Sequence, residues 1–191
     1  MHRDAGDWDT AMTMTLDVLS ALEPRTADAS ANLLALWGAL NFEAAYTAAR
    51  AGEEGHAWRY WDRADRVAQR LPEDFFQTQT SFSRAIMGAH AVTIAVELQK
   101  PGEAVRQAGR LDPARIPSRP RRARHLIEVA RGHYGKGDNE AAVVTLRQAY
   151  DSAPETIRFN GYARQITLDL LGGRAVRKDV HDLALKVGLA S

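Results

Sequence analysis

The sequence predicts an all-helical protein built from repeated pairs of antiparallel helices. Three observations lead to this fold class. A short turn, in most copies a glycine and an acidic residue, recurs along the chain, and each copy is followed by an alanine. Between the turns, apolar residues recur with the three-to-four-residue spacing of helices, and no segment shows the alternation of a strand. Prolines fall mainly at the ends of these segments, where helices must stop or start.

The clearest copy of the pattern runs from Gly137 to Pro154. Ala142 and Ala149 are seven residues apart, so they share one face of a helix, where a neighbouring helix must approach closely. Leu146 fills the space between them, and Pro154 ends the helix because it has no amide hydrogen. This spacing resembles the second half of a tetratricopeptide repeat. The resemblance implies a right-handed α-α superhelix, a tetratricopeptide-like solenoid.

The pattern recurs upstream. One copy begins at Gly52, another at Gly6, and a weaker one covers residues 99–108. The anchor alanines are 46, 47 and 38 residues apart, at positions Ala11, Ala57, Ala104 and Ala142. These intervals exceed the ~34 residues of a standard repeat, so we expect longer helices and loops.

Helices are expected along the whole chain. They cover about residues 7–22, 29–51, 55–71, 81–98, a segment starting at 101, and then 121–134, 140–152, 156–171 and 176–187. Asp7 or Asp9 is the expected cap of the first helix, and Ser81 that of the fourth. Residues 111–120 contain three prolines and are expected to form an extended connector.

The domain organisation follows from these elements. We expect residues 1–191 to form a single repeat domain, with an incomplete first repeat at 1–24. Repeats follow at about 29–72, 81–117 and 121–154, and capping helices at 156–191. A chain of 191 residues is long enough for one domain with a real core. No DNA-binding domain is expected within this chain.

Composition narrows the classes of protein. The chain is 45% hydrophobic and contains no cysteine, so it has neither a disulfide framework nor thiolate chemistry. No segment approaches the ~20 apolar residues that span a bilayer, and the first residues do not resemble a signal peptide. We therefore expect a cytoplasmic protein with no membrane contact and no cofactor.

Charge is distributed unevenly although the net charge is only +1. Residues 1–30 carry six acidic and two basic side chains, whereas residues 100–133 carry nine basic and three acidic ones. The asymmetry is compatible with an acidic partner or with sequence-indifferent DNA binding through phosphate, but such runs are usually solvated surface.

No catalytic or metal site stands out. His125, Glu128 and His133 share one predicted helix, but the two histidines are two turns apart and no HExxH motif or cysteine accompanies them. Residues 132–137 contain glycines and a lysine but follow a helix rather than a strand, so they are a turn and not a phosphate loop. We expect a protein that is not an enzyme and binds no metal.

A binding groove is the better candidate. In tetratricopeptide superhelices the first helix of each pair lines the concave face. The repeat register places eight side chains on this face: Phe42, Tyr46, Arg50, Phe82, Arg124, Ile127, Arg131 and Tyr134. Aromatic rings would hold apolar side chains of a peptide, and guanidinium groups would bind its carboxylates. The alternative is that Phe42 and Tyr46 only pack between helices.

The first helix suggests self-association. It lacks a partner helix in the predicted repeat, so its apolar stripe would have a single neighbour. Exposed stripes of this kind mark interfaces, and two-fold pairing is the commonest arrangement. We expect a homodimer through Trp8, Met12, Leu16 and Leu19.

A more specific family resemblance rests on several runs. Residues 92–98 (VTIAVEL) with 101–104 (PGEA), residues 111–117 (LDPARIP) with 121–127 (RRARHLI), and residues 36–40 (LWGAL) resemble actinobacterial transcriptional regulators. These are helix-turn-helix regulators of the xenobiotic-response-element (XRE) type, and the similar part is their C-terminal tetratricopeptide-like region. Residues 82–87 (FSRAIM) depart from the family pattern, while His90 keeps it.

The resemblance implies a non-catalytic sensor or interaction module of a transcriptional regulator. Its ligand would be a peptide, a protein partner or a small signalling molecule, and DNA would be reached only through a helix-turn-helix domain that this chain lacks. The alternative function is a stand-alone interaction scaffold unrelated to transcription.

Overall fold

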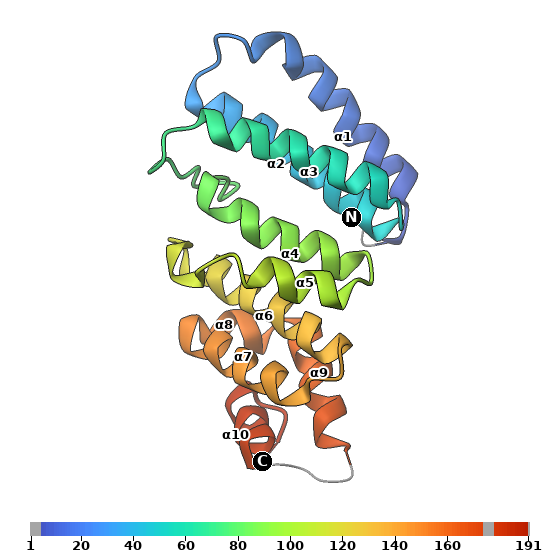
Figure 1. Ribbon diagram of the computed structural model, residues 1–191, viewed down its shortest axis with the longest axis vertical. Helices are drawn as coiled ribbons and strands as arrows, with labels where there is room; N and C mark the ends of the chain where they lie inside the picture. The colour runs from blue at the N-terminus through green and yellow to red at the C-terminus, as the bar shows by residue number, and fades with distance from the viewer. Residues whose placement is uncertain (1–4, 174–177, 191) are drawn as a thin grey trace. The chain divides into compact units, whose positions relative to one another are not determined.

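The computed structural model describes residues 5–173 and 178–190, and this part of the chain is all-helical (Figure 1). It contains ten α-helices and no strand within the described ranges, which confirms the expected fold class at this level. Contacts divide the chain into two compact units, residues 1–99 and 100–191. None of the described helices has the length and apolar character needed to cross a bilayer.

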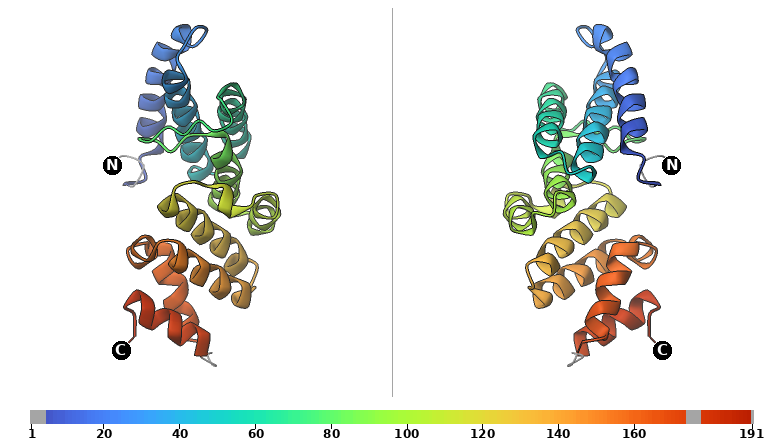
Figure 2. Two further views of the ribbon diagram at one scale, coloured as in Figure 1. Left: turned by 90° about the vertical axis from the view of Figure 1, so that its left-hand side faces the viewer. Right: turned by 90° about the vertical axis from the view of Figure 1, so that its right-hand side faces the viewer.

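Unit 1 is organised around its longest helix, α2 (Ala31–Arg50). This helix contacts α1 (Trp8–Leu22), α3 (Glu54–Arg70) and α4 (Met87–Glu97). Figure 2 shows α1, α2 and α3 side by side in both views. Short 3₁₀ helices lie at Glu23–Arg25 and Arg84–Ile86.

Small residues allow α2 and α3 to lie close together. Five alanines of α2 are almost completely buried, at positions 35, 44, 45, 48 and 49, and so are Ala57, Ala64 and Ala68 of α3. A methyl group keeps the helix axes near each other and loses no rotamer freedom on burial. Beside them the buried Phe82 ring fills the space over Gly38, where a Cβ atom would overlap it.

Unit 2 comprises six α-helices in its described residues. They are α5 (Pro101–Ala108), α6 (Arg119–Gly135), α7 (Asn139–Ser152), α8 (Pro154–Arg158), α9 (Gly161–Leu171) and α10 (Lys178–Val187), with a 3₁₀ turn at Pro113–Arg115. Its core contains Ile127 of α6, Leu146 of α7, Ile157 of α8 and Leu183 of α10.

The same turn recurs with nearly constant geometry. Its glycine has a φ of +79°, +79° and +80° at Gly6, Gly52 and Gly137. The next residue begins the following helix with a φ near −85° and a ψ of 74°, 70° and 73°, at Asp7, Glu53 and Asp138. Only glycine adopts such a positive φ without strain. The recurrence gives the fold a repeat-like character in both units.

Two of these turns also share their hydrogen bonds. Glu53 donates its backbone N–H to the carbonyl of Ala48, five residues back, and Gly52 donates to Ala49. Asp138 and Gly137 donate in the same way to His133 and Tyr134. This pair of bonds closes a helix whose next residue is left-handed. Of the four anchor alanines, Ala57, Ala104 and Ala142 are fully buried, whereas Ala11 is only half-buried.

Several predicted boundaries were wrong. Ser81 does not cap the fourth helix, because it has a φ of +60° and lies before a 3₁₀ turn, and α4 begins only at Met87. The helix expected at 156–171 is two helices, α8 and α9, separated at Phe159 and Asn160. The connector at 111–120 contains a 3₁₀ turn, and its last residues already belong to α6. The predicted start of the last helix, at Val176, lies outside the described residues.

Candidate functional site

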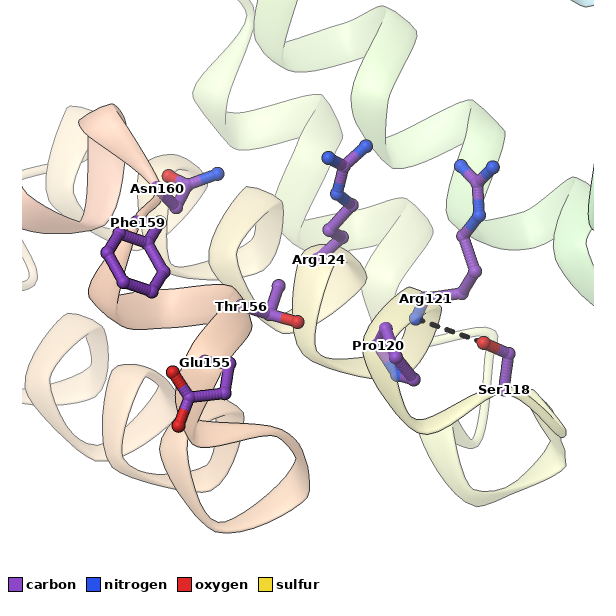
Figure 3. Close-up of a pocket in the computed structure, with 8 residues that line it drawn as sticks. All are labelled: Ser118, Pro120, Arg121, Arg124, Glu155, Thr156, Phe159 and Asn160. Carbon is purple, nitrogen blue, oxygen red and sulfur yellow. Dashed lines mark hydrogen bonds between the residues drawn. The ribbon is translucent and has the colours of Figure 1, made fainter.

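A pocket of about 400 Å³ opens in unit 2 between the start of α6 and the α8–α9 junction (Figure 3). Its lining combines two arginines, one carboxylate, one aromatic ring, one proline and three neutral polar side chains. These are Arg121, Arg124, Glu155, Phe159, Pro120, Ser118, Thr156 and Asn160.

The first turn of α6 supplies one wall and is held firmly in place. The Ser118 hydroxyl caps the helix by accepting the backbone N–H of Arg121 at 3.5 Å. Arg119 donates from its Nε to the Ser152 carbonyl at 2.8 Å, and the Ser152 hydroxyl donates to the Arg119 carbonyl at 3.3 Å. The start of α6 is thus tied to the end of α7. Arg121 and Arg124, one turn apart on α6, share one face.

The opposite wall is α8 and the residues that follow it. Ile157 is buried in the core and fixes the short helix. Arg158 donates from Nε to the Lys186 carbonyl at 3.2 Å and lies 3.4 Å from the Glu155 carboxylate. Asn160 caps α9, because its Oδ1 accepts the backbone N–H of Ala163 at 3.0 Å. These anchors leave Phe159 turned outward, with 84% of its surface exposed.

The charges of the pocket are only partly neutralised within the chain. Glu155 lines the pocket and is paired with Arg158 at 3.4 Å. The exposed Arg124 guanidinium has no hydrogen bond or ion pair to any described residue. Figure 3 shows the Thr156 hydroxyl and the Asn160 amide nitrogen on the side of their wall that faces α6. The pocket therefore presents donors to a negatively charged group, next to an exposed ring.

Beyond the pocket, the surface continues along α6 and α9, but its polar groups are already engaged. Arg131 lies 3.6 Å from the centroid of the Tyr162 ring and 2.6 Å from the Glu128 carboxylate. The Tyr134 hydroxyl donates to Asp169 at 3.1 Å. Burial, and then the neighbouring Asp169, raise the pKa of Tyr134 above its usual value. Of the predicted groove residues on α6, Arg124 alone lines the pocket.

Two of the predicted groove residues lie in the core instead. Ile127 is fully buried in the core of unit 2, and Phe82 has 1% of its surface exposed in unit 1. Neither side chain presents surface to a ligand: Ile127 lies on the core-facing side of α6, and Phe82 lies outside any helix, before the 3₁₀ turn that starts at Arg84. The repeat register was therefore wrong at these two sites.

The remaining predicted groove residues gather in unit 1. The Phe42 ring stacks on His90 with centroids 3.4 Å apart. Arg50 contacts Glu97 at 3.3 Å, donates to the Tyr46 hydroxyl at 3.3 Å, and lies 4.9 Å from the Trp8 ring centroid. The structure brings these groups together as an internal cluster that links α1, α2 and α4.

The apolar stripe of α1 faces its own unit. Leu19 is buried, Trp8, Met12 and Leu16 are half-buried, and the Trp37 indole donates to the Leu19 carbonyl at 3.3 Å. The stripe packs on α2, the single neighbour expected for it, and Trp8, Met12 and Leu16 remain half-buried there. The outer side of α1 carries Met14 and Val18, which are 56% and 46% exposed. The homodimer itself stays a prediction.

The histidines of α6 do not meet in one site. His125 is 3% exposed, and neither ring nitrogen has a hydrogen-bond partner among the described residues. Burial lowers its pKa to about 4, so the ring is neutral at pH 7. His133 lies 3.6 Å from Asp138 instead. Among the described residues, no three metal-ligating side chains converge.

Sequence reasoning missed seven of the eight lining residues, and four of these lie at the α8–α9 junction: Glu155, Thr156, Phe159 and Asn160. The signal was present in Asn160-Gly161, since asparagine is a preferred helix cap and glycine a weak helix former. Reading residues 156–171 as one helix hid the outward turn at Phe159.

Comparisons of this chain with known protein families, with curated proteins and with solved structures found no match.

Proposed function

We propose that this chain is a non-catalytic helical-repeat module that binds a segment of a protein partner. In this proposal the repeats form a right-handed tetratricopeptide-like superhelix. The module would be the sensor or interaction part of a transcriptional regulator of the XRE type, which the sequence resembles. The binding site is the pocket between α6 and α8.

One observation carries the binding proposal: an exposed phenylalanine lies in the same pocket as an arginine with no partner among the described residues. Phe159 is 84% exposed, although covering such a ring is favourable by roughly 1.5–3 kcal/mol. Arg124 lines the same pocket with its charge uncompensated. A partner that covers the ring and supplies an anion satisfies both groups at once.

The lining favours binding over chemistry. The Ser118 hydroxyl is occupied as a helix cap, and the Glu155 carboxylate is paired with Arg158. The lining residues include no histidine or cysteine that could serve as a base or a nucleophile. We therefore propose recognition without a reaction.

Peptide display tests this function directly. A library of random dodecapeptides would be selected on the full chain and, in parallel, on the double variant Arg124→Gln/Phe159→Ala. We expect enriched sequences that bind the natural chain and not the variant. Enrichment of no sequence, or of sequences that bind both proteins equally, would show that this pocket is not a peptide site.

A small signalling ligand is the second candidate, because a volume of about 400 Å³ lies within the usual range of small-molecule sites. A thermal-shift screen of small carboxylic acids would test it. A compound that raises the melting temperature of the natural chain but not of the double variant would favour this candidate over a peptide.

A further inference from the structure

We infer that the pocket recognises a side-chain carboxylate next to an apolar side chain, within an acidic segment of a partner protein. This inference rests on the proposed binding function and specifies its ligand. The ligand unit is thus a pair of residues, one aspartate or glutamate and one apolar neighbour.

The carboxylate end is set by the donors. Arg124 offers a planar guanidinium, whose parallel N–H groups match the two oxygens of a carboxylate. The Thr156 hydroxyl and the Asn160 amide nitrogen lie across the pocket and have no hydrogen bond to any described residue. Asn160 keeps its orientation because its Oδ1 is fixed by the cap of α9. A carboxylate between the walls would receive donors from both.

The apolar end is set by Phe159 and Pro120. Both belong to the lining, and the ring of Phe159 is the most exposed large hydrophobic side chain among the described residues. It cannot turn into the core while Ile157 and Arg158 hold α8 in place. An apolar side chain of the partner would cover this ring and remove both surfaces from water.

The net charge of the lining favours one negative charge over two. Glu155 is paired with Arg158, and Arg124 has no ion pair to any described residue, so Arg124 brings one uncompensated positive charge to the pocket. A carboxylate neutralises it, whereas a phosphate carries about −1.5 to −2 charges at pH 7 and would face Glu155. The pocket therefore suits aspartate or glutamate better than a phosphorylated residue.

The first experiment varies the ligand. Fluorescently labelled dodecapeptides on a glycine-serine background would carry Leu-Asp, Leu-Asn, Ser-Asp or Leu-phosphoserine at the centre, and binding to the full chain would be followed by anisotropy. We expect Leu-Asp to bind about tenfold more tightly than Leu-Asn, since only the carboxylate pairs with Arg124. Leu-Asp should also exceed Ser-Asp and Leu-phosphoserine. Equal binding of Leu-Asp and Leu-Asn would overturn the inference.

The second experiment varies the protein, with matched controls. Arg124→Gln should remove the preference for Asp over Asn, and Phe159→Ala the preference for Leu over Ser. Arg147→Gln changes the net charge equally at an exposed position of α7, outside the pocket, and Leu185→Ala truncates a side chain that is 44% exposed on α10. Both controls should keep both preferences. Loss of the Asp preference in Arg147→Gln would reveal a general charge effect and reject the pocket.

The outcome separates this inference from the function on which it rests. If display selects pocket-dependent peptides without acidic residues, the carboxylate assignment is wrong and the binding module stands. If no selected peptide needs the pocket for binding, both the carboxylate assignment and the binding function are wrong. Circular dichroism of each variant would check folding. If the spectrum of Arg124→Gln differs from that of the natural chain, Arg124→Lys would replace it in the test. That variant keeps the charge but loses the planar fork, so the Asp preference should weaken without vanishing.

Discussion

Arg50 in unit 1 contacts aromatic rings and Arg124 in unit 2 shares a pocket lining with Phe159, yet the two arginines have opposite environments. Arg50 contacts a carboxylate, a tyrosine hydroxyl and a tryptophan ring of its own unit. Arg124 contacts no such group among the described residues and faces an open pocket. An arginine that lies with aromatic side chains can therefore either hold helices of its own unit together or bind a ligand. The first case applies where the chain itself supplies a carboxylate that pairs with the arginine.

The largest expected effect is on the free energy of unfolding when each of these arginines is replaced by methionine. Arg50→Met leaves Glu97 without its arginine, and the carboxylate side chain is only 5% exposed. We expect a loss of about 2–3 kcal/mol in the free energy of unfolding, below the ~3–5 kcal/mol of a fully buried pair, because Arg50 is partly solvated. Arg124→Met should change it by less than about 0.5 kcal/mol. Urea unfolding measures both, and equal losses would contradict the contrast.

The next effect is a pH dependence that belongs to unit 2. His125 has a pKa of about 4 in the folded chain and about 6.5 when unfolded. The stability from its neutral form is therefore complete above pH 6.5 and falls as the pH drops toward 4. Between pH 7 and pH 5 the loss should be about 2 kcal/mol. His125→Gln should remove most of this slope in urea titrations at each pH.

The tryptophans allow this pH effect to be assigned to one unit. All four, Trp8, Trp37, Trp58 and Trp61, lie in unit 1. Their fluorescence reports unit 1, whereas circular dichroism reports helices of both units. We expect acidification to shift the dichroism midpoint more than the fluorescence midpoint. An equal shift would mean that the units unfold together.

A smaller effect concerns the repeated turn. Gly137 has a φ of +80°, and a Cβ there would touch nothing within 4 Å. Gly137→Ala therefore costs only backbone strain, about 1 kcal/mol. Gly161→Ala is the control, since Gly161 has equal space at the start of α9 and no positive φ. A thermal melt that ranks the two variants the other way would contradict the turn assignment.

The smallest effect is a gain. Gln99 occupies the left-handed position in the weaker copy of the turn, at residues 99–108, with a φ of +57°. Gln99→Gly should relieve strain there and raise the free energy of unfolding by about 0.5 kcal/mol, the strain relief being offset in part by greater chain freedom in the unfolded state. A melting temperature that falls instead would indicate that the glutamine side chain makes a stabilising contact.

Local chemistry made most of the helices predictable. Glycine at a positive φ followed by a capping residue marks a turn wherever it occurs, as at Gly52 and Gly137. Alanines seven apart mark a close helix contact for the same local reason, and Ala142 and Ala149 are both fully buried. The burial of Phe82 and Ile127 was misjudged, because which side chains are covered depends on residues that are distant in the sequence. The pocket was not predicted because it forms at the break between α8 and α9, at Asn160, and the periodic spacing of apolar residues does not reveal that break.

The reciprocal hydrogen bonds between Arg119 and Ser152 have a consequence for how occupancy of the pocket could be detected. They join the residue just before Pro120 to the last residue of α7. A ligand that immobilises the first turn of α6 would also stabilise these hydrogen bonds between Arg119 and Ser152. Amide hydrogens at the end of α7 would then exchange more slowly with solvent, although that end lies outside the pocket lining. Hydrogen–deuterium exchange at Ser152 and Ala153 would thus give a remote signal of binding.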